Sequence, residues 1–210
     1  MKERIDSGAM LADLKEAQAG KIVFDAKKYV NEWKVHKHDH FLIPAGTVHC
    51  SGKDTMVLEI SATPYIFTFK LWDWGRVGLD GLPRPVHIGH GEKVIQWDRT
   101  TSWVRENLVN ATKPLFSDGK NSVEHTGLHE REFIETRRYK LTEEIELCSE
   151  GSVSQCNVVE GEGAIVESVD GSFEPYEVHY AETFIIPESV KKFKLKPIGG
   201  EVWILRATVR

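Results

Sequence analysis

The sequence predicts a mainly β protein that begins with helices and carries one more helix between two strand-rich regions. Three observations support this fold class. From residue 132 onward, short runs rich in β-branched and aromatic residues alternate with Gly, Pro and Asp turns, which is typical of an antiparallel sandwich or barrel. Residues 39–76 have a similar strand–turn–strand composition. Residues 8–19 instead space their apolar side chains as a helix does.

Two helices are expected before residue 34. The first covers residues 8–19 and ends near Gly20, and its apolar positions are Met10, Leu11, Leu14 and Ala17. The second covers residues 24–33, with Asp25 as its N-cap. After these helices, the runs FLIPAGTVH, DTMVLEIS and YIFTFKLWDW favour strands that are broken by Pro and Gly.

Residues 77–121 are expected to link the two strand-rich regions. Gly and Pro punctuate the start of this segment, residues 99–109 predict a helix, and NATKPLFSDGKNS predicts a loop. Beyond it we expect strands near residues 132–140, 144–150, 153–160, 163–169, 173–179, 182–187, 191–196 and 201–209. The predicted domains are therefore 1–76, 77–121 and 122–210.

Composition excludes several classes of protein. With 210 residues, 40% of them hydrophobic and 28% charged, the chain is expected to be globular rather than disordered. No apolar run approaches the length that spans a membrane, and the N-terminus lacks the apolar region of a signal peptide. Scattered Lys and Arg argue against nucleic acid as a partner. Cys50, Cys148 and Cys156 have no metal-site spacing and indicate reduced thiols in a cytoplasmic protein.

A weak internal repeat suggests that the two strand-rich regions are related. HFLIPAGTVHC at 40–50 aligns with TFIIPESVKKF at 183–193. The first copy has His49 in its turn, whereas the second has Lys192 at that place. One copy therefore keeps a possible metal ligand that the other lacks.

His49 is the sharpest candidate for a functional side chain. It follows the tight Pro44–Gly46 turn and begins the returning strand, so that in a small barrel its imidazole could reach a metal ion in the barrel mouth. A histidine after a turn is also common as a purely structural residue.

Two further groups of residues have metal-ligand chemistry. His36, His38 and His40 alternate along one expected strand, although a solvated hairpin is the preferred interpretation. A second group, for which a structural role is favoured, consists of His125, His129, Glu130 and Glu132.

The stretch HDHFLIPAGTVHCSGKDTMVLEISATPYIFTFKLWDWGR resembles the class I (type I) mannose-6-phosphate isomerases, and its IPAGTVH part is similar to the second conserved motif of the cupin superfamily. RPVHI at 84–88 and TGLHEREFIETRRYKL at 126–141 also resemble the bacterial members. The resemblance implies a bicupin fold with a helical insertion. It also implies interconversion of mannose 6-phosphate and fructose 6-phosphate with bound Zn²⁺.

The resemblance assigns four residues. His49 corresponds to the last zinc ligand, and Glu59 to the glutamate that lines the site. Lys70 stands where the family has an arginine, and Arg76 matches the arginine after Asp-Trp. In such a reaction a carboxylate suits proton transfer through an enediolate, and a cation suits the developing oxyanion or the phosphate. Lys70 keeps the charge but loses the planar fork of arginine. Glu59 could instead be a strand residue that pairs with a neighbouring cation. Lys70 could be a solvated strand residue, and Arg76 could form a local salt bridge with Asp73.

No Gln-x-His motif precedes His49, so the sequence begins after the place where the other three zinc ligands would lie. We therefore expect an incomplete first barrel, a complete metal-poor second barrel, and an open sheet edge that a second copy or a missing N-terminal segment covers. Three functions stay open. In the first, the chain is a portion of a mannose-6-phosphate isomerase. In the second, it is a non-catalytic cupin-like protein that binds a sugar or stabilises a partner. In the third, it is a small metal-dependent cupin that uses the 36–40 histidines with His49.

Overall fold

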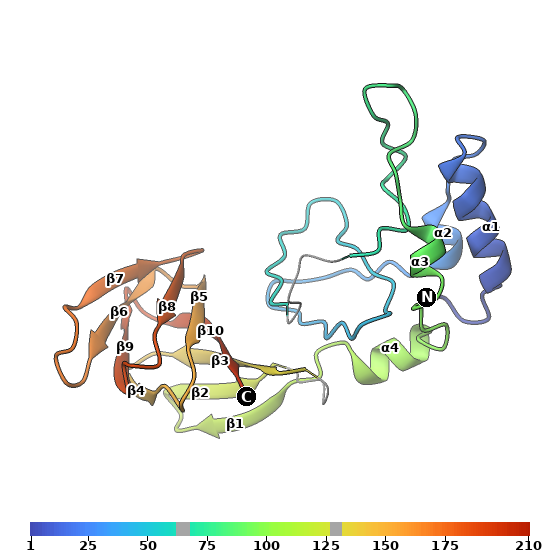
Figure 1. Cartoon of the computed structure of the whole chain (residues 1–210). Coiled ribbons are helices and arrows are strands. Elements are labelled where there is room, and N and C mark those ends of the chain that lie inside the picture. The colour runs from blue at the N-terminus through green and yellow to red at the C-terminus, as the bar shows by residue number, and fades with distance from the viewer. Residues whose placement is uncertain (62–67, 127–131) are drawn as a thin grey trace. The chain divides into compact units, whose positions relative to one another are not determined.

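The computed structural model describes residues 1–61, 68–126 and 132–210 and divides the chain into two compact units, Met1–Val109 and Asn110–Arg210 (Figure 1). The helices are α1 (Ser7–Gln18), α2 (Ala26–Tyr29), α3 (Ile88–Gly91) and α4 (Thr101–Asn107). The strands are β1 (Lys113–Ser117), β2 (Asn121–His125), β3 (Ile134–Leu141), β4 (Ile145–Cys148), β5 (Ser154–Glu160), β6 (Gly163–Ser168), β7 (Tyr176–His179), β8 (Thr183–Ile186), β9 (Lys192–Ile198) and β10 (Val202–Val209). The described residues thus form a mainly β protein, as the composition predicts.

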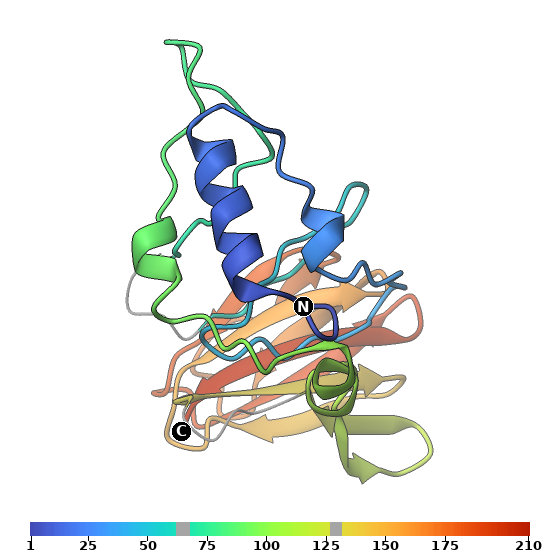
Figure 2. The ribbon, with the colours of Figure 1, turned by 90° about the vertical axis from the view of Figure 1, so that its right-hand side faces the viewer.

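The helices α1, α2 and α4 form where the sequence predicts helices, whereas α3 lies in the Gly- and Pro-rich start of the 77–121 segment, where none was expected. Asp6 caps α1 by accepting a hydrogen bond from the backbone N–H of Ala9, and Asp25 caps α2 through the N–H of Lys27. Met10 and Leu14 of α1 are buried in a cluster that includes Ile88 of α3 and Tyr29 of α2. Figures 1 and 2 show α1 beside both short helices. The prediction of a second helix is confirmed, although α2 is shorter than the range 24–33.

The strands expected in the runs 41–49, 54–61 and 65–74 do not form in the part of these runs that the structure describes; residues 65–67 of the last run lie outside the described residues. In the described part of the first unit, the β pairing consists of isolated bridges, Phe41 with Val109 and Val77 with Pro83. A strand is stabilised by the ladder of hydrogen bonds to its neighbours. The β-rich composition of these segments therefore does not produce a sheet in their described residues.

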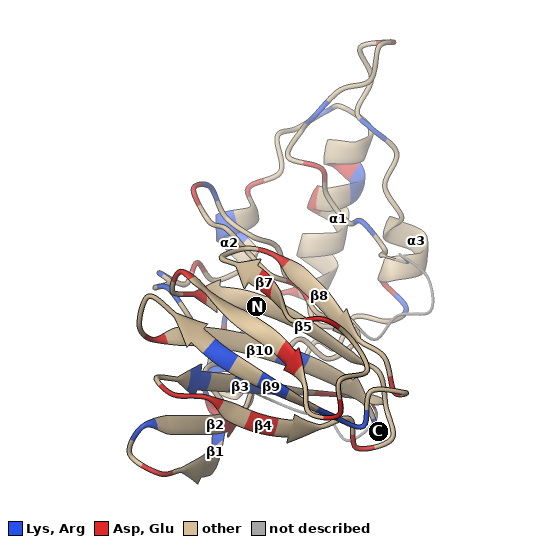
Figure 3. Cartoon of the chain, turned by 90° about the vertical axis from the view of Figure 1, so that its left-hand side faces the viewer, with Lys and Arg blue, Asp and Glu red and all other residues tan. Residues whose placement is uncertain are grey.

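The second unit contains two antiparallel sheets. One has the strand order β1-β2-β3-β10-β5-β8, and the other has the order β4-β9-β6-β7. Lys192 and Lys194 on β9 pair with Glu146 and Glu144 near β4, so opposite charges alternate across these neighbouring strands (Figure 3). The eight strands predicted beyond residue 131 all form, within a few residues of their expected bounds.

The loop expected at residues 110–122 is wrong, because β1 and β2 form a hairpin there. The carboxylate of Asp118 accepts hydrogen bonds from the backbone N–H groups of Asn121 and Lys120 at the hairpin turn. These bonds hold the pKa of Asp118 below its usual range. All five residues of β1 are exposed, so this strand lacks the alternation of apolar and polar residues that would have marked it.

The two copies of the internal repeat share one turn. In the first copy the N–H of Thr47 donates to the carbonyl of Pro44 over 3.2 Å, and in the second Val190 donates to Pro187 over 3.0 Å. The Ile-Pro turn is therefore equivalent in both copies. Its flanking strands, β8 and β9, form only in the second.

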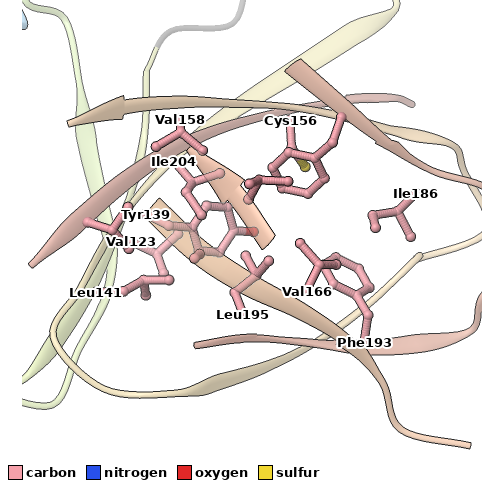
Figure 4. Packing of buried hydrophobic residues seen from close by; sticks show 14 of the residues in the cluster. Val123, Tyr139, Leu141, Cys156, Val158, Val166, Ile186, Phe193, Leu195 and Ile204 are labelled. Carbon is pink, nitrogen blue, oxygen red and sulfur yellow. The ribbon is translucent and has the colours of Figure 1, made fainter. Parts of the chain in front are cut away.

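The core of the second unit lies between the two sheets (Figure 4). Its fully buried side chains come from both layers: Tyr139, Leu141, Val158 and Ile204 from the larger sheet, and Val166, Phe193 and Leu195 from the smaller one. This packing supplies the hydrophobic stabilisation that an isolated sheet lacks. Among the helices that the structure describes, none is long and apolar enough to cross a membrane.

The cysteines differ in their exposure, and this difference predicts their reactivity. Cys156 lies in the core, where burial raises the pKa of its thiol to about 12, although nearby Arg206 lowers it in part. Cys148 is exposed. Because the thiolate is the reactive form, iodoacetamide in a mildly alkaline buffer should label Cys148 readily and Cys156 only after unfolding in urea. Peptide mass spectrometry measures both; equal labelling rates in the native protein would contradict the buried position of Cys156.

Candidate functional site

The turn that precedes His49 is anchored to the segment around residues 94–99. One guanidinium nitrogen of Arg99 donates to the carbonyls of Pro44 and Ala45 at 3.0 and 2.7 Å, and to the hydroxyl of Thr47. The N–H of Gln96 donates to the carbonyl of Gly46 at 3.0 Å. These contacts hold the turn in one conformation and so position the chain at His49.

His49 itself is exposed, and its Nδ1 lies 2.8 Å from the carbonyl oxygen of Thr47. Because a carbonyl oxygen only accepts hydrogen bonds, Nδ1 carries the proton in this arrangement. In the tautomer with its proton on Nδ1, Nε2 is the ring nitrogen whose lone pair could bind a metal ion.

The described residues do not fit a zinc ion at His49. Structural and catalytic zinc sites use three or four protein ligands. Among the residues that the structure describes, no group of three His, Cys, Asp or Glu side chains is arranged to hold a metal ion. The donor set around His49 is therefore too small for the metal that the resemblance implies.

Lys70 and Arg76 come together on a single carboxylate, that of Asp73. Lys70 Nζ lies 3.4 Å from Asp73 Oδ1, Arg76 Nη1 4.0 Å from the same oxygen, and Arg84 Nη1 3.7 Å from Oδ2. The Asp73 side chain is only 9% exposed, whereas those of Lys70, Arg76 and Arg84 are 49%, 63% and 53% exposed. We call these four residues the Asp73 cluster. Its formal charge is +2.

Local backbone geometry explains how the Asp73 cluster forms. Trp74 and Gly75 both have positive φ, and the resulting turn lets the N–H of Arg76 donate to the carbonyl of Asp73 at 2.9 Å. The chain then folds back over residues 77–83, and the N–H of Arg84 donates to the carbonyl of Arg76 at 3.0 Å. Two arginines that are distant in sequence are thereby held side by side.

Lys70 and the tryptophans tie the cluster to the helical core. The N–H of His87 donates to the carbonyl of Lys70 at 2.7 Å, and the ring of Trp72 packs edge-on against Phe24 at 5.5 Å. The ring centroid of Trp74 lies 4.7 Å from that of Trp72, and Trp74 is about half exposed. Exposed cations and a half-exposed aromatic residue on one short segment suit the binding of a polar, anionic small molecule.

Glu59 is exposed and, within the described residues, shares no hydrogen bond or ion pair with the Asp73 cluster. Sequence reasoning indicated Asp73 as a possible ion-pair partner of Arg76, but it missed Arg84 and the contact between Lys70 and Asp73. Lys70, Asp73 and Arg76 are spaced by three residues, and this spacing could have indicated that both cations contact Asp73. Nothing in the sequence brings Arg84 to Asp73, because that contact depends on the closure of the 77–83 loop.

The other candidate ligands are dispersed. His36 is exposed, and Asp39 accepts a hydrogen bond from its backbone N–H at 2.9 Å. His125 lies on β2, and the carbonyl of Glu132 accepts a hydrogen bond from Arg210. His129 and Glu130 lie outside the described residues.

Comparison with known proteins gives a consistent set of relatives. No family model matches the sequence. The mannose-6-phosphate isomerase of Streptococcus mutans is 23% identical over 156 residues, which are 74% of this chain and 45% of that protein. Mannose-6-phosphate isomerase ManA of Bacillus subtilis is 24% identical over 163 residues, 78% of this chain and 47% of that protein.

A solved structure extends the comparison to the fold. The crystal structure of the mannose 6-phosphate isomerase from Bacillus subtilis matches with a TM-score of 0.51 and 16% identity, over 66% of this chain and 39% of that one. At this identity the match shows the fold alone. The chain spans about half the length of the curated relatives it matches.

Proposed function

We propose, from the similarity of this chain to curated mannose-6-phosphate isomerases, that the Asp73 cluster binds a phosphorylated sugar for aldose–ketose isomerisation. The observation that carries the proposal is the charge surplus of this cluster, in which three exposed cations share one buried carboxylate. The sugar in the proposal is mannose 6-phosphate, and the product is fructose 6-phosphate.

The geometry supports a phosphate ligand because Asp73 cannot neutralise its three partners. Each cation lies 3.4–4.0 Å from the carboxylate, so none is held in a short, saturated ion pair. Exposed ion pairs of this kind are worth at most about 1 kcal/mol each, so the cations can turn toward a stronger acceptor at little cost. A phosphate dianion matches the surplus of two charges, and arginine offers it paired N–H donors.

The chemical step assigned to this chain is proton transfer between C1 and C2 of the sugar. Glu59 corresponds to a glutamate that lines the site in the family that the chain resembles, and a carboxylate suits that proton transfer; Lys70 or Arg76 would stabilise the developing oxyanion or hold the phosphate. These two roles rest on the resemblance. No step is derived through zinc, because the described residues around His49 do not fit it.

Binding is tested with the intrinsic fluorescence of the tryptophans. Mannose 6-phosphate should quench or shift this emission at concentrations at least about tenfold lower than mannose, because charged hydrogen bonds to the phosphate are absent for mannose. Arg84→Gln should weaken binding by about tenfold. Lys53→Gln is the matched control, since Lys53 is an exposed cation of the same unit outside the cluster. Equal affinity for mannose and mannose 6-phosphate would overturn the proposal.

Turnover is measured on the same sample by a coupled assay for fructose 6-phosphate, together with its zinc content. Glu59→Gln should lower turnover by about 100-fold or more while leaving sugar-phosphate affinity within a factor of about two. If the protein contains stoichiometric zinc and His49→Ala loses it, then His49 is a zinc ligand, as the resemblance implies. Binding of mannose 6-phosphate without turnover would refute the isomerase assignment and favour the alternative, a non-catalytic sugar-binding cupin.

A further inference from the structure

Arg206 on β10 is a buried cation whose hydrogen-bond partners are all neutral. It is 3% exposed. Its Nε donates to the hydroxyl of Ser154 at 2.9 Å, one terminal nitrogen to the carbonyl of Cys148 at 2.7 Å, and the other to the hydroxyl of Tyr139 at 3.5 Å. Within the described chain no carboxylate forms an ion pair with it. Because a buried charge without a counter-charge is unfavourable, this site favours the approach of an anion.

The other charged side chains near Arg206 form ion pairs with one another. Arg137 pairs with Glu135 at 2.6 Å and with Glu150 at 3.0 Å. Glu146 pairs with Lys192 at 2.9 Å. These six charges sum to zero, because Arg137 has two carboxylate partners, and Arg206 is the cation among them that forms no ion pair with a described residue.

Arg206 and Tyr139 line an open groove of about 440 Å³ in the second unit. The groove lies between the β1–β3 side of one sheet and β4 of the other, and its apolar wall includes Leu115, Phe116 and Leu147. Leu115 and Phe116 are about half exposed, so this wall faces solvent. A concave site of this volume, mostly apolar with a few polar groups, has the character of a small-molecule site.

The hydrogen-bonding capacity at the base of the groove is incompletely used. A guanidinium has five N–H donors, and Arg206 donates three hydrogen bonds to the described residues. The Tyr139 hydroxyl accepts from Arg206 and keeps its own proton for donation. A carboxylate could therefore accept from both side chains.

We propose that this groove binds a small organic monoanion, a carboxylate with an apolar body. Its carboxylate faces Arg206 and Tyr139, and its apolar part covers Leu115 and Phe116. The single cation without an ion pair to the described residues and the apolar wall favour such a molecule over a sugar phosphate, which carries two charges and a polar body. The site is separate from the Asp73 cluster and does not depend on the function proposed for that cluster.

The test compares 4-fluorobenzoate with its neutral isostere 4-fluorobenzamide by ¹⁹F NMR titration of the full chain. The benzoate should bind saturably and at least about tenfold more tightly than the amide, because only the benzoate supplies the missing counter-charge. Equal affinities, or no saturable binding of the benzoate, would overturn the proposal.

A matched pair of variants locates the binding. Leu115→Glu places a negative charge on the groove wall and should weaken benzoate binding by about tenfold. Ile185→Glu adds the same charge on β8, the opposite edge strand of the same sheet, at a residue that is 51% exposed compared with 53% for Leu115. This control should retain wild-type affinity to within a factor of about two. Both substitutions are on exposed edges, so the test does not depend on replacing the buried Arg206. Wild-type affinity in Leu115→Glu would place the benzoate elsewhere and contradict the proposal.

Discussion

Replacing Phe193 with alanine should lower the free energy of unfolding of the second unit by about 3–5 kcal/mol. Phe193 lies on β9, is fully buried between the two sheets, and packs in the same cluster as Val166 and Leu195. The truncation removes the transfer free energy of the ring and leaves a cavity that the paired strands cannot close. It also removes the ring that lies 5.6 Å from the Arg206 guanidinium, where a cation–π contact offsets part of the cost of burying that charge.

Urea denaturation followed by the β-sheet signal in circular dichroism measures this change, because the strands of the described residues lie in the second unit. Ile185→Ala is the control, since Ile185 is exposed on β8 and its truncation should change stability by less than about 1 kcal/mol. Similar losses in both variants would show that Phe193 is not at the centre of the core.

Replacing Gly46 with alanine should destabilise the first unit by about 3 kcal/mol. Gly46 has φ of +83°, which disfavours a side chain by about 1–2 kcal/mol. A Cβ at this position would also lie 2.4 Å from the carbonyl oxygen of Val94 and 2.9 Å from Cγ of Gln96. The turn must therefore move away from residues 94–96, which breaks the hydrogen bond from Gln96 to the Gly46 carbonyl and displaces His49.

Gly81→Ala separates the two causes of this loss. Gly81 has a similar φ of +73°, but a Cβ there would meet no atom within 4 Å. It should lose only the backbone contribution, about 1 kcal/mol. Tryptophan fluorescence during urea unfolding measures both variants, because Trp33, Trp72, Trp74, Trp97 and Trp103 all belong to the first unit. Equal destabilisation by the two substitutions would mean that the Gly46 turn is not in close contact with residues 94–96.

The strands of the second unit were predictable because their side chains alternate between core and solvent. β8 shows this directly, with Phe184 and Ile186 buried and Thr183 and Ile185 exposed. Such a pattern specifies which face of the strand is buried before any neighbour is known. The short edge strand β1 has no buried residue, so its sequence carries no such pattern and its pairing with β2 emerged only from the structure.

The contacts of the candidate site likewise include some that the sequence indicated and others that appeared only in the structure. Lys70, Asp73 and Arg76 are close in sequence, and their spacing suggested ion pairing as one interpretation. The anchoring of the Gly46 turn by Arg99, the arrival of Arg84 at Asp73, and the burial of Arg206 beneath an open groove all join residues that are distant along the chain.

The sequence by itself determined the helix caps, the Ile-Pro turns and the strands that alternate between core and solvent, because those features depend on neighbouring residues and on a two-residue period. Only the tertiary structure decided which charges meet and which remain unbalanced. Electrostatic partners are selected by distance in space, and the folding of the chain brings together groups that its sequence separates.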